Sequence, residues 1–152
     1  MTNWLSADYA DQLLRMVFAL LGGAAIGLNR FLRHKSAGMR THALVAMGAA
    51  IAALLFTGEE AISRVAQGVL TGVGFIGAGV IMRDGESHVQ GLTTAASVWI
   101  CAILGLVCGV GDLFVVGAGV LLTLVTLIVG RPIERFLARL AHDRAAANDK
   151  SG

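Results

Sequence analysis

LFVVGAGVLLTLVTLIVG, residues 113–130, contains no charged side chain. A helix needs about 17 to 25 mostly apolar residues to cross the hydrocarbon core of a bilayer, so this stretch is long enough. Lipid offers the backbone no hydrogen-bond partners, which makes a helix the only conformation open to a single apolar span. The stretch therefore predicts a transmembrane helix, and with it the fold class.

Four further apolar stretches precede it. The second of them is long enough to span only if Arg40 to His42 are included. The chain is 56% hydrophobic and 14% charged, with a mean hydropathy of +0.74, and a soluble domain of this size could not bury that much apolar surface. We expect an all-α integral membrane protein, a bundle of five transmembrane helices. The four preceding stretches are Leu13 to Leu28, Ala43 to Thr57, Val65 to Met82 and Leu92 to Val110.

The residues after Gly130 differ in kind from the spans. Pro132 is expected to end the last span, after which apolar residues recur at helical spacing with arginines between them. This pattern predicts a short basic amphipathic helix on the cytoplasmic membrane surface, with a frayed end as the alternative beyond Ala141. We divide the chain into a transmembrane domain, residues 1–130, and a basic cytoplasmic tail, residues 131–152.

The distribution of Lys and Arg predicts the orientation. With five spans, the first connection and the tail lie on the same side, and the positive-inside rule makes that side the cytoplasm. The opposite side has only Arg15 and Arg64, so the N-terminus is expected outside and the C-terminus in the cytoplasm. Asp8 and Asp11, where a signal peptide would carry positive charge, favour retention of the first span. The basic residues of the first connection and the tail are Arg30, Arg33, Lys35, Arg40, Arg131, Arg135, Arg139, Arg144 and Lys150.

Glycines are concentrated in the third span. GVGFIG, residues 72–77, matches a dinucleotide-binding pattern, but that motif requires a preceding strand and a water-accessible site. Small residues in a membrane instead allow helices to approach closely. We therefore expect a tight bundle centred on the third span, with one small-residue stripe available for a homodimer. The glycines given this packing role are Gly68, Gly72, Gly74, Gly77 and Gly79, and the pairs Gly23/Gly27 and Gly105/Gly109 repeat the spacing in the first and fourth spans.

Polar residues gather at the ends of the spans that are expected to face the cytoplasm. Taken singly, each has a plain explanation: a threonine can cap a helix, an arginine can reach lipid headgroups, and a histidine can lie at an interface. Taken together, Asp84 lies within reach of several arginines at a low-dielectric boundary, where charges are costly unless paired or functional. We expect the arginines to pair with Asp84 and with backbone carbonyls, which would hold the two cytoplasmic connections in one shape. The candidate cluster is Asn29, Arg30, Arg40, Thr41, His42, Arg83, Asp84, Thr93 and Thr94.

The sequence gives little sign of a metal, cofactor or catalytic site. Only Asp84 and Glu86 could offer carboxylates at the cytoplasmic end of the bundle, and no acid lies within a span, which argues against a cation pore or a proton relay. Cys101 and Cys108 are too far apart on one helix for a disulfide and are read as packing residues. The mid-span polar residues can donate to carbonyls of their own helices. These are Thr71, Ser97, Thr123 and Thr126.

Three segments resemble, in order, the hallmark segments of the MgtC/SapB family of bacterial inner-membrane proteins. The match extends from about Leu13 to Gly130. The family pattern usually reads Gly-Leu-Glu-Arg-Glu where this chain has Gly-Leu-Asn-Arg-Phe at 27–31, so roles that need the two missing acids are not carried over. The segments are KSAGMRTH (35–42), GVGFIGAGVI (72–81), and VQGLTTAA (89–96) with Trp99.

The resemblance implies a small accessory protein linked to growth at low magnesium and to survival inside host cells. It implies action through other membrane proteins, the rotary ATP synthase among them, and not magnesium transport. Well-studied members carry a soluble domain after the spans, whereas only about twenty residues follow Gly130, so we expect a short form.

We therefore favour a non-enzymatic regulatory protein that contacts lipid and membrane proteins but no nucleic acid. A small cation transporter or channel, for magnesium, is the alternative, and a purely structural packing protein is the third. An enzyme is least expected, because no nucleophile and base can be placed together.

Overall fold

The apolar stretches form helices, and the polar stretches form short connections between them. The computed structural model describes residues 7–56, 58–84 and 88–149, with side chains described for residues 8–56, 58–81 and 90–141. The elements are α1 Ala7–Leu32, α2 Met39–Leu55, α3 Glu59–Val80, β1 Met82–Asp84, β2 His88–Gln90, α4 Leu92–Val110 and α5 Leu113–Asp149.

The predicted helical membrane architecture is confirmed. Helices α1, α3, α4 and α5 are long and apolar enough to cross a bilayer, and α2 is a shorter apolar helix of 17 residues. At 1.5 Å per residue, α2 is roughly 25 Å long, a little less than the hydrocarbon thickness. The chain is therefore a multi-pass membrane protein with four long candidate spans and one shorter apolar helix.

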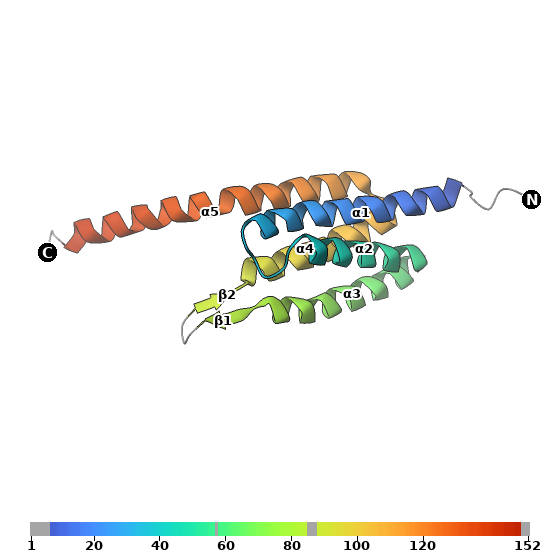
Figure 1. Ribbon diagram of the computed structural model, residues 1–152, viewed down its shortest axis with the longest axis horizontal. Helices are drawn as coiled ribbons and strands as arrows, with labels where there is room; N and C mark the ends of the chain where they lie inside the picture. Colours follow the sequence, from blue (N-terminus) through green and yellow to red (C-terminus); the bar gives the residue numbers. More distant parts are fainter. Residues whose placement is uncertain (1–6, 57, 85–87, 150–152) are drawn as a thin grey trace, which may run out of the picture.

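Helix α4 lies at the centre of the bundle and packs against each of the other four helices. Val98, Cys101, Ala102 and Cys108 on this helix are fully buried. The prediction of a bundle centred on the third span is wrong, because α3 lies at the edge, mainly along α4 (Figure 1). Both cysteines are free and lie in the core, as the packing interpretation predicted.

Helix α2 fits closely between α1 and α4 because both neighbours present glycines to its backbone. A Cβ added at Gly23 of α1 would lie 2.5 Å from the carbonyl oxygen of His42, and one added at Gly109 of α4 would lie 2.5 Å from that of Ala50. A Cβ at Gly105 would overlap the carbonyl oxygen of Ala46. These distances confirm that the glycine pairs of the first and fourth spans serve close helix packing.

The glycines of α3 behave differently. A Cβ added at Gly68, Gly72, Gly74 or Gly79 would meet no described atom within 4 Å, and Gly77 alone faces α4, with the Cβ of Ala95 3.6 Å away. The expectation that all five glycines pack the bundle is therefore wrong for contacts within the chain. Their use by a second copy stays a prediction.

The connection between α3 and α4 is a β-hairpin where the sequence predicted a loop. Strands β1 and β2 pair antiparallel, with Met82 opposite Gln90 and Asp84 opposite His88. Gly91 then starts α4 with φ of +95°, and an added Cβ there would overlap the carbonyl oxygen of Val80. Glycine is the residue that satisfies both requirements.

Helix α5 continues through Pro132 without a break, so two further predictions are wrong: the proline does not end the helix, and no separate amphipathic helix follows. Proline has no backbone N–H to donate, so one carbonyl of the preceding turn loses its partner. Membrane helices tolerate this loss because neighbouring helices, side chains or water can bond to that carbonyl instead. The segment after Gly130 instead extends α5 past the bundle (Figure 1). The predicted boundary between residues 130 and 131 lies within this helix.

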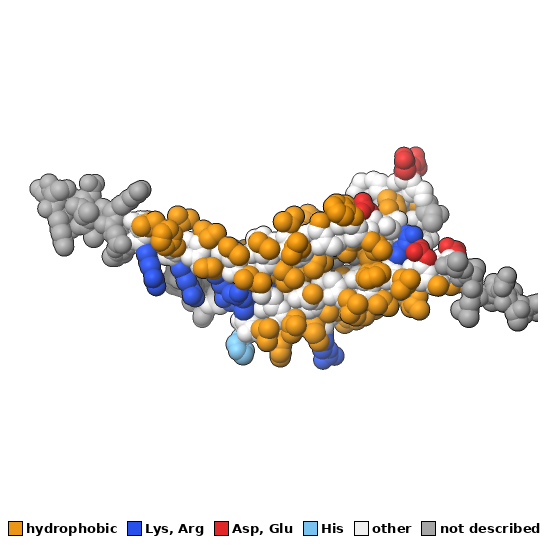
Figure 2. Space-filling model, turned by 90° about the horizontal axis from the view of Figure 1, so that it is seen from above, with side chains coloured by type: hydrophobic (Ala, Val, Ile, Leu, Met, Phe, Trp, Pro, Cys, Tyr) orange, Lys and Arg blue, Asp and Glu red, His pale blue; other side chains and the backbone are white. Residues whose placement is uncertain are grey.

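The two ends of the bundle carry opposite charge. The α1–α2 connection, the hairpin and the extension of α5 lie at one end, which we call the basic end (Figure 1). Figure 2 shows Lys and Arg side chains gathered there, acidic side chains at the other end, and apolar side chains between them. We call the second end, which carries Asp8, Asp11, Glu59 and Glu60, the acidic end.

Candidate functional site

Arg30 lies in the last turn of α1 at the basic end, and only 2% of its surface is exposed. Its Nη2 group donates a hydrogen bond to Oγ1 of Thr94, 2.5 Å away in the first turn of α4. A buried guanidinium is costly unless its donors are satisfied, so this bond matters more than one at the surface. It ties the end of α1 to the start of α4.

His42 makes the second connection, from the first turn of α2. Its ring is fully buried, with Nδ1 2.8 Å from the carbonyl oxygen of Gly38 and Nε2 2.9 Å from Oγ of Ser97. A carbonyl oxygen only accepts, so Nδ1 carries a proton. The Ser97 hydroxyl also lies 2.8 Å from the carbonyl oxygen of Thr94 and donates to it. Because the hydroxyl has one proton, a neutral His42 competes with that carbonyl for it.

Arg30, His42, Thr94 and Ser97 form what we call the buried polar network. Beside it, Nε of Arg30 and Oδ1 of Asn29 have no hydrogen-bond partner among the described residues. Each buried polar atom left without a partner costs about 1 to 3 kcal/mol. Such atoms call for an explanation beyond packing, and a functional role is one.

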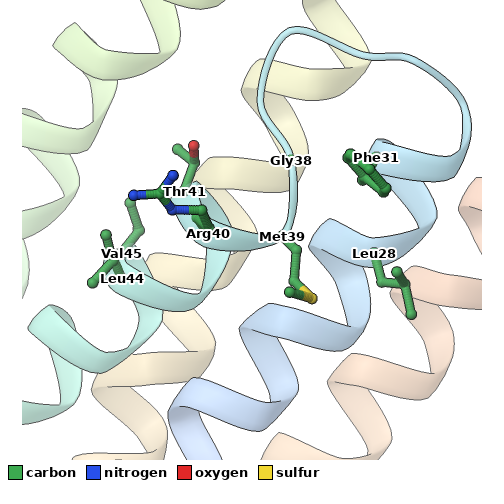
Figure 3. Close-up of a pocket in the computed structure, with 8 residues that line it drawn as sticks. All are labelled: Leu28, Phe31, Gly38, Met39, Arg40, Thr41, Leu44 and Val45. Atoms are coloured by element: carbon green, nitrogen blue, oxygen red, sulfur yellow. The ribbon is translucent and has the colours of Figure 1, made fainter.

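Three other predicted site residues point outward. Arg40 and Thr93 are exposed and Thr41 is half-buried, so none of them belongs to the buried polar network. Arg40 and Thr41 instead line an open groove of about 610 Å³ between the end of α1 and the start of α2 (Figure 3). The groove is otherwise mostly apolar. Its remaining lining residues are Leu28, Phe31, Gly38, Met39, Leu44 and Val45.

Arg83 and Asp84 lie on β1, at the same end of the bundle. Their side chains fall outside the described ones, and so does the expected pairing of arginines with Asp84. The buried polar network holds α1, α2 and α4 together through residues whose side chains are all described.

Sequence reasoning identified Arg30, His42 and Thr94 but did not place Ser97 or Gly38 with them. Ser97 was expected only to donate to its own helix, which it does, as do Thr123 and Thr126. The available signal was spacing: Ser97 follows Thr94 by three residues, which puts both on one face of α4.

Two backbone hydrogen bonds from the connection between α1 and α2 close the C-terminal end of α1. The amide of Lys35 donates to the carbonyl of Arg30 at 3.1 Å, and the amide of His34 donates to that of Phe31 at 2.9 Å. This is the Schellman arrangement, which usually has glycine at the left-handed position. His34 occupies that position, with φ of 52°.

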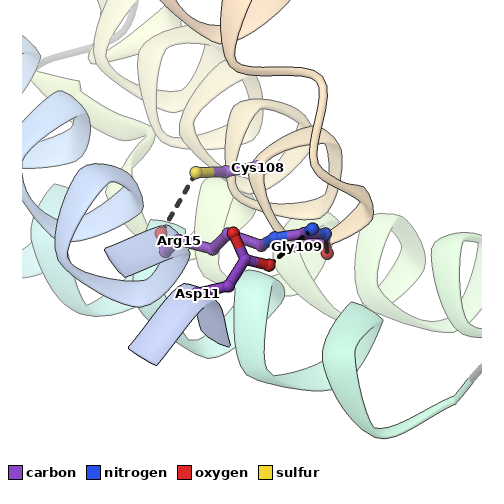
Figure 4. A network of polar contacts seen from close by, with 4 residues as sticks. All are labelled: Asp11, Arg15, Cys108 and Gly109. Carbon is purple, nitrogen blue, oxygen red and sulfur yellow. Dashed lines mark hydrogen bonds and ion pairs between the residues drawn. The ribbon is translucent and has the colours of Figure 1, made fainter. Parts of the chain in front are cut away.

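A second polar cluster, at the acidic end, was not predicted. Arg15 pairs with Asp11 at 2.6 Å and donates to the carbonyl oxygen of Gly109 at 3.0 Å, while the thiol of Cys108 donates to the carbonyl oxygen of Arg15 at 3.1 Å (Figure 4). These contacts join the start of α1 to the end of α4. In the sequence, Arg15 indicated the orientation of the chain and Asp11 was evidence against a signal peptide, but their pairing was not predicted.

Comparison with known proteins gives a consistent family match. The model of the MgtC family matches residues 16–136. SrpB of Synechococcus elongatus is 42% identical over 151 residues, which cover 88% of this chain and 79% of SrpB. Protein MgtC of Salmonella typhimurium is 46% identical over 102 residues, which cover 66% of this chain and 44% of that protein. Protein MgtC of Brucella abortus is 37% identical over 131 residues, which cover 84% of this chain and 55% of that protein.

The chain thus spans about half the length of these two MgtC proteins. No solved structure matches the chain significantly.

Proposed function

The chain belongs to the MgtC family of membrane proteins, as its motifs predicted, and we propose that it is a non-enzymatic accessory protein that binds another membrane protein. In this proposal all five helices cross a bacterial inner membrane, α2 included, with the N-terminus outside and the basic end in the cytoplasm. The binding surface is the groove at the basic end together with the exposed residues around it.

The observation that carries the proposal is the position of the buried polar network directly behind the groove. Gly38, whose carbonyl oxygen contacts His42, also lines the groove, as do Leu28 and Phe31 on either side of Arg30 in α1. The hydrogen bonds of Arg30 and His42 anchor both helices to α4. A surface whose walls are fixed in this way loses little conformational entropy when a partner binds.

The chemistry of the groove suits a helix of another membrane protein. Its floor is apolar, Leu44 and Met39 are exposed within it, and Arg40 lies beside this apolar surface. Within lipid, apolar packing and a few polar contacts are what hold two helices together. Arg40 would then donate hydrogen bonds to a carboxylate of the partner or to the carbonyl oxygens at the C-terminus of one of its helices. The rotary ATP synthase is one such partner, and a second copy of this chain is another.

Photocrosslinking in native membranes tests the proposal. A photoreactive amino acid at Leu44, in the groove, should capture one defined protein, and Arg40→Glu should abolish the product. The same amino acid at Leu121, an exposed residue of α5 outside the groove, is the matched control. Identical products at the two positions, or none at Leu44, would rule out the groove as a binding surface.

Cysteine labelling tests the proposed orientation separately. The native cysteines are fully buried, so an added thiol at Ser36 or Glu59 can be read on its own. A membrane-impermeant reagent applied to intact spheroplasts should label Glu59→Cys and leave Ser36→Cys unlabelled. The reverse pattern would place the basic end outside.

The physiological part of the proposal is adaptation to low magnesium or to host stress, and it rests on family membership. No observation on the described residues favours the alternative, a cation transporter. The described buried polar residues between the helices are cationic or neutral, and such residues do not attract a cation. Magnesium flux into liposomes that contain only this protein would nevertheless support transport and displace the accessory role.

A further inference from the structure

A pocket with four arginines lies at the basic end and shares no lining residue with the groove. Its volume is about 470 Å³, and it is open to the surface between the end of α1 and the extension of α5. Arg33 contributes from just after α1, and Arg131, Arg135 and Arg139 contribute from α5. Their spacing of four residues places the last three on one face of the helix. We call it the arginine pocket.

The positive charge of the arginine pocket has no described counter-charge. The two described ion pairs, Arg15 with Asp11 and Arg64 with Glu60, both lie at the acidic end. Glu134 is the one acid in residues 131–141, the part of the α5 extension whose side chains are described, and it does not line the pocket. Like charges four residues apart disfavour a helix, so an anion bound between them would relieve a repulsion that the chain itself leaves in place.

The surroundings of the pocket add to this excess. The pKa of Lys35, in the α1–α2 connection, is lowered first by partial burial and then by the positive charges of Arg131 and Arg30. Lys35 therefore lies close enough to Arg131 and to Arg30 to interact with both. The positive field extends from the surface pocket toward the buried polar network.

The pocket also has an apolar wall, which distinguishes between anions. Ile128 and Phe136 line it, and both are exposed, as are Ile133 and Leu137 on the same stretch of α5. A free phosphate ion would make no use of these side chains. An anionic phospholipid would place its headgroup among the arginines and its acyl chains against the apolar surface of α5.

We propose that the arginine pocket binds the phosphodiester headgroup of an anionic membrane phospholipid. Arginine is suited to this task because its planar group can donate two parallel hydrogen bonds to phosphate oxygens. A bound lipid would bridge α1 and α5 and fix the extension of α5 at the membrane surface. The site is independent of the proposed protein partner.

Lipid titration of the purified full chain in a non-ionic detergent tests the site. The probes are dioctanoyl-phosphatidylglycerol, dioctanoyl-phosphatidylcholine with the same acyl chains and no net charge, and inorganic phosphate. Arg131→Gln/Arg135→Gln should weaken binding of the glycerol lipid roughly tenfold or more, since each basic residue near an anionic headgroup contributes. Arg64→Gln removes a positive charge at the acidic end, outside both proposed binding surfaces, and should leave binding unchanged.

Three results would overturn the proposal. These are equal affinity for the two lipids, equal loss in the pocket variant and in Arg64→Gln, and binding of inorganic phosphate as tight as that of the glycerol lipid, which would assign the pocket to a free anion. If the pocket variant fails to fold, a photoactivatable phosphatidylglycerol with the wild-type chain replaces it. Attachment within residues 128–139 supports the site, and attachment confined to other segments contradicts it.

Discussion

The glycines of α1 and α4 and the glycines of α3 follow the same spacing in the sequence and have opposite surroundings in the structure. At Gly23 and Gly105 a single added carbon would collide with the backbone of α2, whereas at Gly68 and Gly72 it would meet no described atom within 4 Å. The motif thus shows that a helix can approach a neighbour closely. Which helices have such a neighbour depends on the position of α2.

Helix α2 occupies that position because its own side chains are small. Ala46, Ala49, Ala50 and Ala53 are buried on it, between α1 on one side and α4 on the other. Small residues on all three helices let the backbones come together, and dispersion contacts then stabilise the contact. Among the described residues, no helix packs on the glycine face of α3 in this way.

The largest expected effect comes from filling the tightest contact. Gly105→Leu would force a side chain into the carbonyl oxygen of Ala46, which is backbone and cannot turn aside. We expect a loss of more than about 3 kcal/mol, at or above the upper end for overpacked cores. Gly72→Leu, on the open face of α3, is the matched control and should leave the unfolding midpoint in detergent near that of the wild type. Equal losses would break the comparison.

Replacing a glycine by alanine is a smaller change, and its effect on the free energy of unfolding should have opposite signs in the two regions. Gly23→Ala adds a Cβ 2.5 Å from the carbonyl oxygen of His42 and should cost about 2 kcal/mol in the free energy of unfolding. Gly68→Ala should instead stabilise the chain by up to about 1 kcal/mol, since alanine favours a helix over glycine. Denaturant titration followed by circular dichroism measures both. A stabilised Gly23→Ala variant would show that α1 and α2 are farther apart than described.

Two adjacent threonines extend the comparison to polar residues. Thr94 is buried and accepts the hydrogen bond of Arg30, whereas Thr93 is exposed. Thr94→Val keeps the shape and removes the acceptor, and we expect it to cost about 1.5 kcal/mol, as for hydrogen bonds to charged groups. Thr93→Val should change the thermal unfolding midpoint little. If Thr93→Val proved the more harmful of the two, the assignment of inward and outward faces at the start of α4 would be reversed.

The smallest effect concerns a position that suits glycine and does not have it. His34 adopts a φ of 52°, which a residue with a Cβ rarely favours. His34→Gly should stabilise the chain by roughly 0.5 to 1 kcal/mol, with Ser36→Gly, in the same connection, as the control that gains nothing. Thermal unfolding of the two variants measures the difference in stability between them. Destabilisation by His34→Gly would mean that the imidazole makes a contact that stabilises the chain by more than the backbone strain costs.

Much of this arrangement could be predicted from hydropathy and charge alone. The helices and the gathering of polar residues at one end follow from where polar residues interrupt apolar stretches. The same pattern predicts Arg30, His42 and Thr94 at one level of the bundle but not their hydrogen-bond partners. Such patterns locate residues along the membrane normal because each span has to begin and end at the water interface.

The face that each helix turns toward its neighbours could not be predicted in the same way. The central place of α4, the outward glycines of α3 and the partnership of Ser97 with His42 depend on which helix faces go together. Several helices of this chain are apolar on most sides, so hydropathy does not identify a buried face. The prediction that Pro132 ends the last helix was wrong because a helix in a membrane can continue despite one missing backbone hydrogen bond.

The most direct test of the central claim, that the buried polar network joins α2 to α4 at the basic end, is a double-mutant cycle on His42 and Ser97. The unfolding free energies of His42→Ala, Ser97→Ala and the double variant give the coupling between the two side chains, which lie 2.9 Å apart. We predict a coupling energy of about 1 kcal/mol, typical of a buried hydrogen bond. Strictly additive effects would contradict the account.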